Sequence, residues 1–278
     1  MLPRTISAFI LVFIICFFLY NPFLWWILTI LGLLFVIIGT IETINLARRI
    51  NIKTFYTTTI FSAVILFIDG SFYHFYNFIP LIILTVLFAF LAQMLVLREQ
   101  NAIANISTGV LSSIYVSVPL GLFFHILKKI PDPTQSASIS LFLLVIVWMT
   151  DTGAYLVGSS IGKTKFAPKL SPRKTVEGAI GGFAGAILSA IILYFTLPAL
   201  KYSFNFGLLE AFFIAIILSF FCQLGDLAES ALKRDAGVKD SGKTFTGHGG
   251  VLDIIDSLLF CIPVYYLYLR WFYPLYNL

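Results

Sequence analysis

Long apolar runs separated by short polar breaks form the main pattern of the chain. Residues 9–20, 27–38, 81–97 and 180–197 are such runs, and they approach or reach the roughly 20 apolar residues that a helix needs to cross a hydrocarbon core. Breaks at Pro, Gly and charged clusters delimit nine predicted helices. Their ranges are 5–20, 23–41, 55–69, 76–97, 106–127, 138–157, 177–199, 207–233 and 251–272.

The composition agrees with a chain that spans a membrane. Hydrophobic residues make up 59% of the sequence and charged residues 11%, whereas soluble domains carry roughly 25% charged residues. We therefore predict an all-α polytopic membrane protein with about nine transmembrane helices. The first apolar run does not end in the small residues of a signal-peptide cleavage site, so we interpret it as a retained helix.

The basic residues are divided unevenly between the two sides that nine helices would define. Most of the 18 Lys and Arg residues fall on the side that holds the amino terminus. By the positive-inside rule that side, with the amino terminus, is cytoplasmic. The net charge of +5 is modest, and we expect no nucleic-acid partner.

Acidic residues are sparse in the first half of the chain and more frequent after residue 150. We interpret the early acids as ordinary interfacial residues near helix ends: Glu42, Asp69, Glu99 and Asp132. Several later acids fall inside or at the mouth of apolar helices, where a charge costs about 3 kcal/mol unless it is paired or bound to a metal. We therefore expect a lipid-facing scaffold in residues 1–137 and a catalytic region in residues 138–278.

Two predicted helices of the catalytic region carry polar residues on one face. Asp151 lies one turn before Tyr155, and the alternative to a functional role is a hydrogen-bonded packing pair. The helix 207–233 has a polar stripe at i, i+3, i+4 and i+7, formed by Asp226, Glu229, Ser230 and Lys233. Such a stripe can line one cavity, or it can form a salt-bridge ladder along the helix.

The basic loop before helix 177–199 indicates an anion site. Ser171 is suited to be an N-cap and Pro172 to be the first helical residue. Arg173 and Lys174 would then lie in the first turn, where free backbone N–H groups and cations together favour phosphate. The alternative is an ordinary basic cytoplasmic loop.

Glycines after this loop repeat at four-residue spacing. Gly178 and Gly182 form one such pair, and Gly181 and Gly185 form another. Small residues at this spacing are typical of close helix packing or of a dimer contact. We expect packing rather than chemistry here, and we expect the protein to be a homodimer.

The loop after helix 207–233 is rich in glycine and lysine. Its segment 237–244 matches the P-loop pattern G-x-x-x-x-G-K-T, but a true P-loop follows a buried strand, and here a helix precedes it. We therefore expect no P-loop NTPase, although glycine N–H groups and a lysine bind phosphate on any fold. His248 lies among glycines that permit close approach of a ligand, and it either contacts substrate or orients the loop.

Two acids open the last predicted helix. Asp253 and Asp256 are three residues apart, so their carboxylates point the same way, as oxygen ligands of a hard cation such as Mg²⁺ would need. The alternative is that acids are favoured at a helix start by the helix dipole.

These segments together resemble the phosphatidate cytidylyltransferase family, also called the CDP-diacylglycerol synthases. The run 230–256 is closely similar to the family signature, and 151–155, 171–178 and 225–230 are similar to its other characteristic stretches. The resemblance covers residues 151–256, and the hydropathy of the whole chain agrees with it.

Two positions depart from the family pattern. Thr246 stands where the family usually has Pro, and Ile254 stands where it usually has Arg. The contact of the missing Arg is then either absent from this chain or made by Lys239, Lys243 or Arg234.

The resemblance implies that CTP and phosphatidate react to give CDP-diacylglycerol and pyrophosphate. It implies Mg²⁺ as cofactor, with a second metal ion as an option, and an active site on the cytoplasmic side of the bacterial inner membrane. The implied metal ligands are Asp226, Asp253 and Asp256. The implied catalytic residues are Asp151, Lys233, Lys239, Asp240 and His248. The implied substrate-binding residues are Ser171, Arg173, Lys174, Thr175, Glu229, Ser230, Arg234, Lys243, Gly249 and Gly250.

Two other functions stay open at this point. A CTP-dependent lipid kinase, such as a dolichol kinase, is similar to this family in its carboxy-terminal region, and its products would be a phospholipid and CDP. An ion-coupled transporter would also place acids in the membrane, but near the midplane and repeated along the chain. A CDP-alcohol phosphotransferase is disfavoured because its motif is absent from the sequence.

Overall fold

Long α-helices make up most of the chain. The computed structural model describes residues 15, 17–97, 101–199, 206–244 and 249–273. In chain order, the elements are η1 (Pro22–Leu24), α2 (Trp25–Arg49), α3 (Tyr56–Tyr73), α4 (Phe78–Ala92), the π-helical turn η2 (Gln93–Leu97), α5 (Ala102–Lys129), α6 (Pro133–Ile161), β1 (Lys165–Ala167), β2 (Ser171–Thr175), α7 (Val176–Ala199), α8 (Leu208–Asp235) and α9 (Leu252–Phe272).

The helical, polytopic fold class is confirmed. Within the described ranges, seven helices are long and apolar enough to cross a membrane, and α3 is not among them. The predicted helices after residue 20 all have counterparts, α2 to α9. The predicted helix 5–20 lies almost entirely outside the described residues, so the count of nine spans and the cytoplasmic amino terminus stay predictions.

The chain forms two compact units, and each is described separately. Unit 1 comprises Met1–His125 and Leu232–Ile255, and unit 2 comprises Ile126–Ala231 and Asp256–Leu278. The two divisions near the carboxy terminus fall inside α8 and α9, so each of these helices contributes to both units. The proposed scaffold and catalytic regions were defined by function rather than by compactness, and they stay a prediction.

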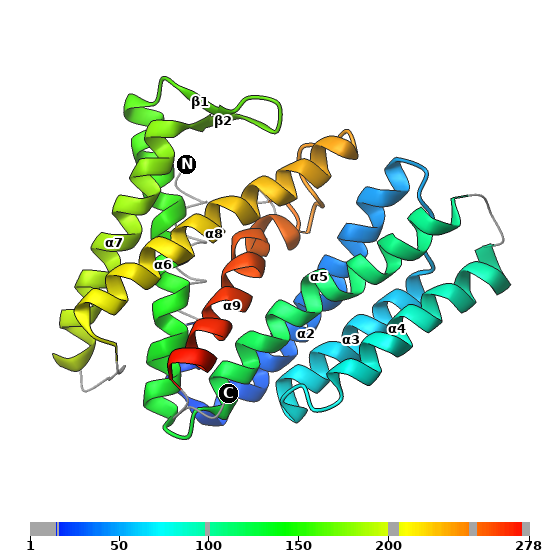
Figure 1. The fold of residues 1–278 in the computed structure, drawn as a ribbon, viewed down its shortest axis with the longest axis horizontal. Helices are drawn as coiled ribbons and strands as arrows, with labels where there is room; N and C mark the ends of the chain where they lie inside the picture. Colours follow the sequence, from blue (N-terminus) through cyan, green and yellow to red (C-terminus); the bar gives the residue numbers. More distant parts are fainter. Residues whose placement is uncertain (1–14, 16, 98–100, 200–205, 245–248, 274–278) are drawn as a thin grey trace. The chain divides into compact units, whose positions relative to one another are not determined.

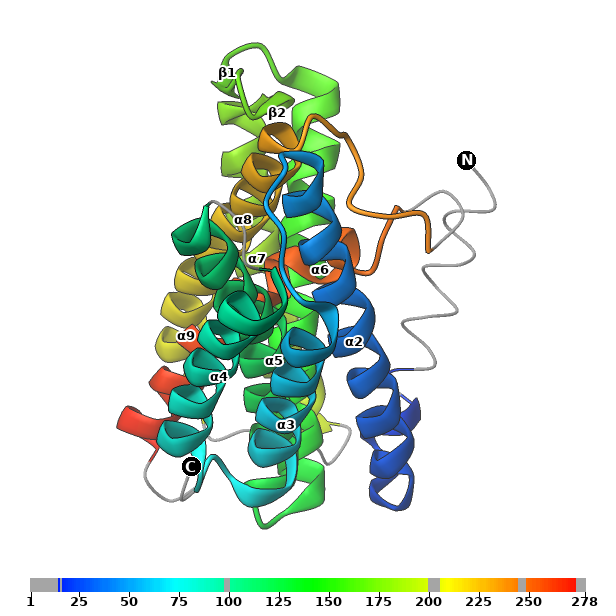
Figure 2. The same cartoon turned by 90° about the vertical axis from the view of Figure 1, so that its right-hand side faces the viewer.

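In unit 1, α2 to α5 pack through aromatic rings and small residues. Helices α3 and α4 run side by side in both views (Figure 1 and Figure 2). The rings of Phe67 and Phe124 meet edge to face at 5.5 Å, and Gly32 makes room for them, since a Cβ there would overlap the Phe124 ring. Burial of such side chains is the main favourable contribution to the packing of the unit.

In unit 2, α6 and α7 meet along a seam of glycines. A Cβ at Gly153 would overlap the carbonyl oxygen of Gly181, and a Cβ at Gly185 would overlap that of Met149. The interpretation of Gly181 and Gly185 as packing residues is therefore confirmed within one chain. The hairpin β1–β2 caps the end of this helix pair (Figure 1).

The hairpin replaces the loop and helix start that the sequence predicted. Ser171 to Thr175 form strand β2, so the prediction that Ser171 caps α7 and that Arg173 and Lys174 lie in its first turn is wrong. Thr175 caps the helix instead, because its Oγ1 accepts a hydrogen bond from the backbone N–H of Gly178 at 3.1 Å.

Glu177 fixes the base of the hairpin from the first turn of α7. Its carboxylate accepts hydrogen bonds from the N–H of Lys163 at 3.1 Å and from the N–H and the hydroxyl of Thr164. This contact draws the chain before β1 onto α7, which leaves residues 171–175 extended against β1.

Candidate active site

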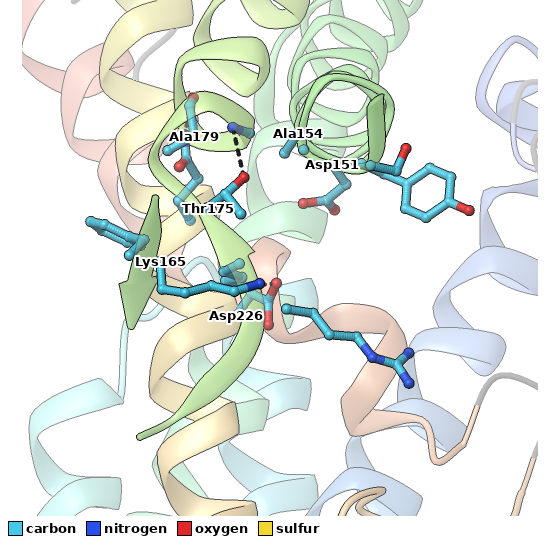
Figure 3. A pocket seen from close by; sticks show the side chains of 14 residues that line it. Asp151, Ala154, Lys165, Thr175, Ala179 and Asp226 are labelled. Carbon is cyan, nitrogen blue, oxygen red and sulfur yellow. Dashed lines mark hydrogen bonds and ion pairs between the residues drawn. The ribbon is translucent and has the colours of Figure 1, made fainter. Parts of the chain in front are cut away.

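A cavity in unit 2 contains several of the residues singled out by the sequence. We call it the α6–α8 cavity, and its volume is about 490 Å³. Its lining comes from four parts of the unit, α6, the hairpin, α7 and α8: Asp151, Ala154, Tyr155, Gly158, Ser159, Lys165, Phe166, Arg173, Lys174, Thr175, Gly178, Ala179, Gln223 and Asp226. Figure 3 shows Asp151 and Asp226 in this lining.

An ion pair crosses the lining of the cavity. Lys174 Nζ lies 2.7 Å from Asp226 Oδ2, and the two side chains are 25% and 36% exposed. Ser230 Oγ donates a longer hydrogen bond, 3.4 Å, to Asp226 Oδ1. The strand β2 therefore brings Lys174 to the polar stripe of α8, with the pair accessible from the cavity.

Further carboxylates of unit 2 lie close to this pair. Asp151 is exposed to the cavity, accepts a hydrogen bond from Cys222 Sγ at 3.4 Å, and interacts electrostatically with Asp226 and Lys174. Asp256 is buried, and its charge interacts with those of Asp226, Glu229 and Asp151. Asp226 thus interacts with Lys174 and with two further carboxyl groups, those of Asp151 and Asp256.

The donor set of these carboxylates fits a hard divalent cation, which prefers oxygen ligands. In the described part of the chain, no three His, Cys, Asp or Glu side chains stand close enough together to hold a metal ion as they are. Lys174 occupies one oxygen of Asp226. A cation that bound this oxygen would therefore compete with Lys174.

A second polar cluster lies in unit 1, where the loop between α8 and α9 meets α2. We call it the Glu42 cluster; it consists of Glu42, Lys233, Ser241, Thr244, Gly250, Val251, Leu252 and Asp253. Lys233 Nζ lies 2.6 Å from Asp253 Oδ1, and these side chains are only 11% and 9% exposed. The ion pair in this cluster is therefore largely shielded from solvent.

Asp253 has several other donors around it. Its Oδ2 accepts hydrogen bonds from the N–H of Ser241 at 2.9 Å, from Ser241 Oγ at 2.8 Å and from the N–H of Gly250 at 2.7 Å. These contacts hold Ser241 and Gly250 of the loop against the start of α9. The role of Asp253 as a metal ligand stays a prediction, and its oxygens are occupied in the structure by Lys233, Ser241 and Gly250.

Glu42 was missed by the sequence interpretation. The prediction that it is an ordinary interfacial residue is wrong, because the residue is 4% exposed and accepts hydrogen bonds from four donors. The available signal was its place directly after the predicted span 23–41 and among the apolar residues Ile41 and Ile44, since an acid at the mouth of an apolar helix is the argument that drew attention to Asp151. Asp69 is also buried and accepts from the backbone and side chain of Asn77.

The remaining candidates are spread over the loop of unit 1. Lys239, Asp240 and Lys243 are exposed, and Arg234 Nη1 donates to the carbonyl of Val238 at 2.9 Å. The segment 237–244 follows helix α8 rather than a strand, so the expectation that it is no P-loop is confirmed.

The glycines of this loop allow close approach of protein carboxylates. Gly249 has a φ of +87°, and a Cβ there would overlap Asp253. A Cβ at Gly250 would overlap Glu42 and Ser241 Oγ. His248 and Thr246 lie outside the described residues, so the expectations for them stay predictions.

Comparison with known proteins identifies the family. The model of the Cytidylyltransferase family matches residues 2–272. The chain belongs to this family. Its cavity and its Glu42 cluster are therefore features of a cytidylyltransferase-family protein that lies within the membrane.

Two relatives show to which members of the family the chain is similar. The chain is 49% identical over 125 residues to a protein named phosphatidate cytidylyltransferase from Staphylococcus aureus, which is 45% of this chain and 46% of the relative. It is 44% identical over 163 residues to the phosphatidate cytidylyltransferase of Bacillus subtilis, which is 58% of this chain and 57% of the relative. These alignments span about half the length of the curated relatives.

Proposed function

We propose that the chain is a phosphatidate cytidylyltransferase, which transfers the cytidylyl group of CTP to phosphatidate and releases pyrophosphate. The observation that carries the proposal is the family match over residues 2–272. The relatives are named phosphatidate cytidylyltransferase, and these names indicate phosphatidate as the lipid substrate. The α6–α8 cavity supports it, because cations and carboxylates line one accessible space.

The reaction exchanges one phosphoanhydride bond for another. A phosphate oxygen of phosphatidate attacks the α-phosphorus of CTP, and the bond from that phosphorus to the oxygen of the β-phosphate breaks. The attacking oxygen is already ionised near neutral pH, so no strong general base is required. The main barrier is repulsion between two anions, which positive groups lower by neutralising charge and holding the reactants in line.

The cations of the α6–α8 cavity provide such groups. Lys165, Arg173 and Lys174 all line it. When substrate enters, Lys174 would leave Asp226 and bind a phosphate oxygen. This change of partner costs little free energy, because an ion pair of this exposure contributes about 0–1 kcal/mol to stability. Thr175 and Ser171 flank these cations on β2, and we assign them to the same phosphate contacts.

Magnesium would be held by Asp226 and Asp256, with Asp151 and Glu229 close by. Bound there, a divalent cation would neutralise charge on the phosphates. Asp151 lines the cavity and offsets the positive charge of Lys174, and we assign buried Glu229, which interacts with Asp256, to the support of the same site. A second metal ion stays a prediction, and so does a direct role of Asp253 in metal binding.

The basic residues of unit 1 are proposed as further phosphate contacts. Lys239 and Lys243 are exposed on the loop, and Arg234 lies at the end of α8. Lys233 is bound to Asp253 in a largely buried ion pair, so its direct role at the phosphates stays a prediction. Asp240, His248, Gly249 and Gly250 of the same loop and Ser230 of unit 2 complete the assigned set. Each of these assignments is tested by a single substitution in the assay below.

The protein is an integral membrane protein with several apolar helices. We propose that it lies in the bacterial inner membrane with its site on the cytoplasmic side, where CTP is present, and that it forms a homodimer. Accessibility of Lys239 and Lys243 to a membrane-impermeant amine reagent, in intact cells and in inverted vesicles, tests the orientation. Chemical cross-linking in membranes tests the dimer.

The proposed activity is tested with purified protein, CTP labelled at the α-phosphate, phosphatidate and Mg²⁺. The expected products are labelled CDP-lipid and pyrophosphate in equal amounts, and EDTA should abolish their formation until Mg²⁺ is restored. CDP together with a newly phosphorylated lipid would instead identify a lipid kinase. Absence of any labelled lipid would refute the transferase assignment.

A further inference from the structure

Both oxygens of the Glu42 carboxylate accept hydrogen bonds within unit 1. Its Oε1 accepts hydrogen bonds from Thr244 Oγ1 at 2.9 Å and from the N–H of Val251 at 3.1 Å. Its Oε2 accepts from Ser241 Oγ at 3.2 Å and from the N–H of Leu252 at 2.8 Å. Each oxygen therefore binds one side chain and one backbone group of the segment 241–252.

These contacts complete the start of α9. The first N–H groups of a helix lack partners within the helix, and a Ser, Thr, Asn or Asp usually caps them. Here Val251 holds the capping position and has no polar side chain. Glu42 supplies the cap from α2, and its negative charge also interacts favourably with the positive end of the α9 dipole.

The glycines of the loop give an independent indication that the carboxylate shapes this segment. A Cβ at Gly242 or at Gly250 would overlap the oxygens of Glu42. Both glycines thus provide space for a side chain that lies about 200 positions earlier in the sequence.

Glu42 and the ion pair of Lys233 and Asp253 contact the loop at a shared residue. Ser241 links the two, because its Oγ lies 2.8 Å from Asp253 Oδ2 and 3.2 Å from Glu42 Oε2. Lys239 and Lys243 stand on either side of Ser241. Their backbone positions are therefore set by the contacts of Ser241 and Thr244.

We propose that Glu42 is a positioning residue for the loop between α8 and α9, and that it sets where Lys239 and Lys243 present their charges to CTP. This inference rests on the proposed function, since it assigns these lysines to the phosphates of the nucleotide. Glu42 is 4% exposed, so we assign it no direct contact with substrate. It acts through the side chains of Ser241 and Thr244 and the N–H groups of Val251 and Leu252.

The test compares Glu42→Gln and Glu42→Ala with wild type. Gln keeps one acceptor oxygen but places an NH₂ group against two of the donors, so part of the binding is retained. We expect KM for CTP to rise about tenfold in Glu42→Ala and about threefold in Glu42→Gln, and kcat/KM for CTP to fall about 100-fold and 10-fold. KM for phosphatidate should stay within about twofold in both.

A matched control is Asp69→Asn, which alters another buried carboxylate of unit 1. We expect it to leave KM for CTP unchanged. A protein that is merely less well folded loses active molecules, which lowers the apparent kcat without altering KM for CTP. The graded rise in KM from Gln to Ala thus separates positioning from a purely structural role.

Trypsin cleavage provides a readout that needs no activity. The loop offers exposed Lys239 and Lys243, so release of Ser241 and Thr244 should speed cleavage there about tenfold in Glu42→Ala relative to both wild type and Asp69→Asn. Equal cleavage rates, or unchanged KM for CTP in an active Glu42→Ala enzyme, would overturn the proposal. If wild type makes no CDP-lipid, the proposed function fails, and the cleavage rates still decide whether Glu42 holds the loop.

Discussion

The α6–α8 cavity and the Glu42 cluster each contain a Lys–Asp ion pair, but the two pairs differ in what surrounds them. In the cavity, Lys174 and Asp226 are 2.7 Å apart and 25% and 36% exposed. In the cluster, Lys233 and Asp253 are 2.6 Å apart and 11% and 9% exposed, and Asp253 also binds Ser241 and Gly250. The two ion pairs therefore have similar lengths, but we expect them to contribute different free energies.

Exposure determines whether such a pair can exchange partners. A partly exposed pair contributes about 0–1 kcal/mol, because water replaces the lost contact. Removal of one partner from a buried pair costs about 3–5 kcal/mol, because the other charge is left without compensation. The cavity pair is thus suited to bind and release phosphate, and the cluster pair is suited to hold the loop in place.

The largest effect is expected at Asp226. Asp226→Asn removes the charge that the proposed metal site requires, while the shape of the side chain is kept, so CDP-lipid synthesis should fall at least about 1,000-fold. The rate with labelled CTP and the thermal unfolding midpoint measure the two properties. Glu210→Gln, at the other end of α8, is the control and should retain full activity; an active Asp226→Asn enzyme would remove this residue from the metal site.

Replacement of the two lysines compares the ion pairs directly. Lys233→Met should lower the free energy of unfolding by about 3–5 kcal/mol, whereas Lys174→Met should lower it by about 1 kcal/mol or less. Denaturant unfolding in detergent, followed by circular dichroism, measures both values. Equal losses would show that the two pairs do not differ as their exposures indicate.

Two glycines of the loop test how closely the cluster is packed. Gly250→Ala places a methyl group against Glu42 and Ser241 and should cost about 1–3 kcal/mol of stability. Gly237→Ala meets nothing within 4 Å but has a φ of +67°, so backbone strain alone should cost about 1 kcal/mol. A larger loss for Gly237→Ala than for Gly250→Ala would contradict the described packing.

The smallest effect is expected for Lys165→Ala. Lys165 lines the cavity from the strand β1, and its flexible exposed side chain should contribute about 1 kcal/mol to phosphate binding. KM for CTP should therefore rise about fivefold, with stability unchanged. An unchanged KM for both CTP and phosphatidate would exclude Lys165 from substrate contact.

The helices were predictable from the sequence because apolar runs bounded by Pro, Gly and charges fix their positions. The hairpin was not, since Ser171 followed by Pro172 and Thr175 followed by Val176 are both acceptable helix starts. The choice depends on Glu177, which binds the N–H groups of Lys163 and Thr164. Such a contact across 13 residues has no signature in local sequence.

The candidate site, like the fold, was predictable from the sequence only in part. The spacing of the polar stripe on α8 could be recognised in the sequence. It correctly put Ser230 beside Asp226, and the Ser230 hydroxyl contacts Asp226 in the structure. The partner of Asp226 was not readable, because Lys174 reaches it from a strand that was not predicted. Glu42 was overlooked because its partners lie near the far end of the chain, and no periodicity relates positions so distant.

The glycine seam between α6 and α7 has a consequence for how the protein tolerates its lipid environment. Gly153 and Gly181 approach each other with no side chain between them, so close packing holds these helices together and leaves no gap for an acyl chain. Asp151 on α6 and Thr175 before α7 therefore keep a constant separation as the bilayer thickens or thins. We expect hydrophobic mismatch to tilt α6 and α7 together, while the width of the cavity between Asp151 and Thr175 stays the same.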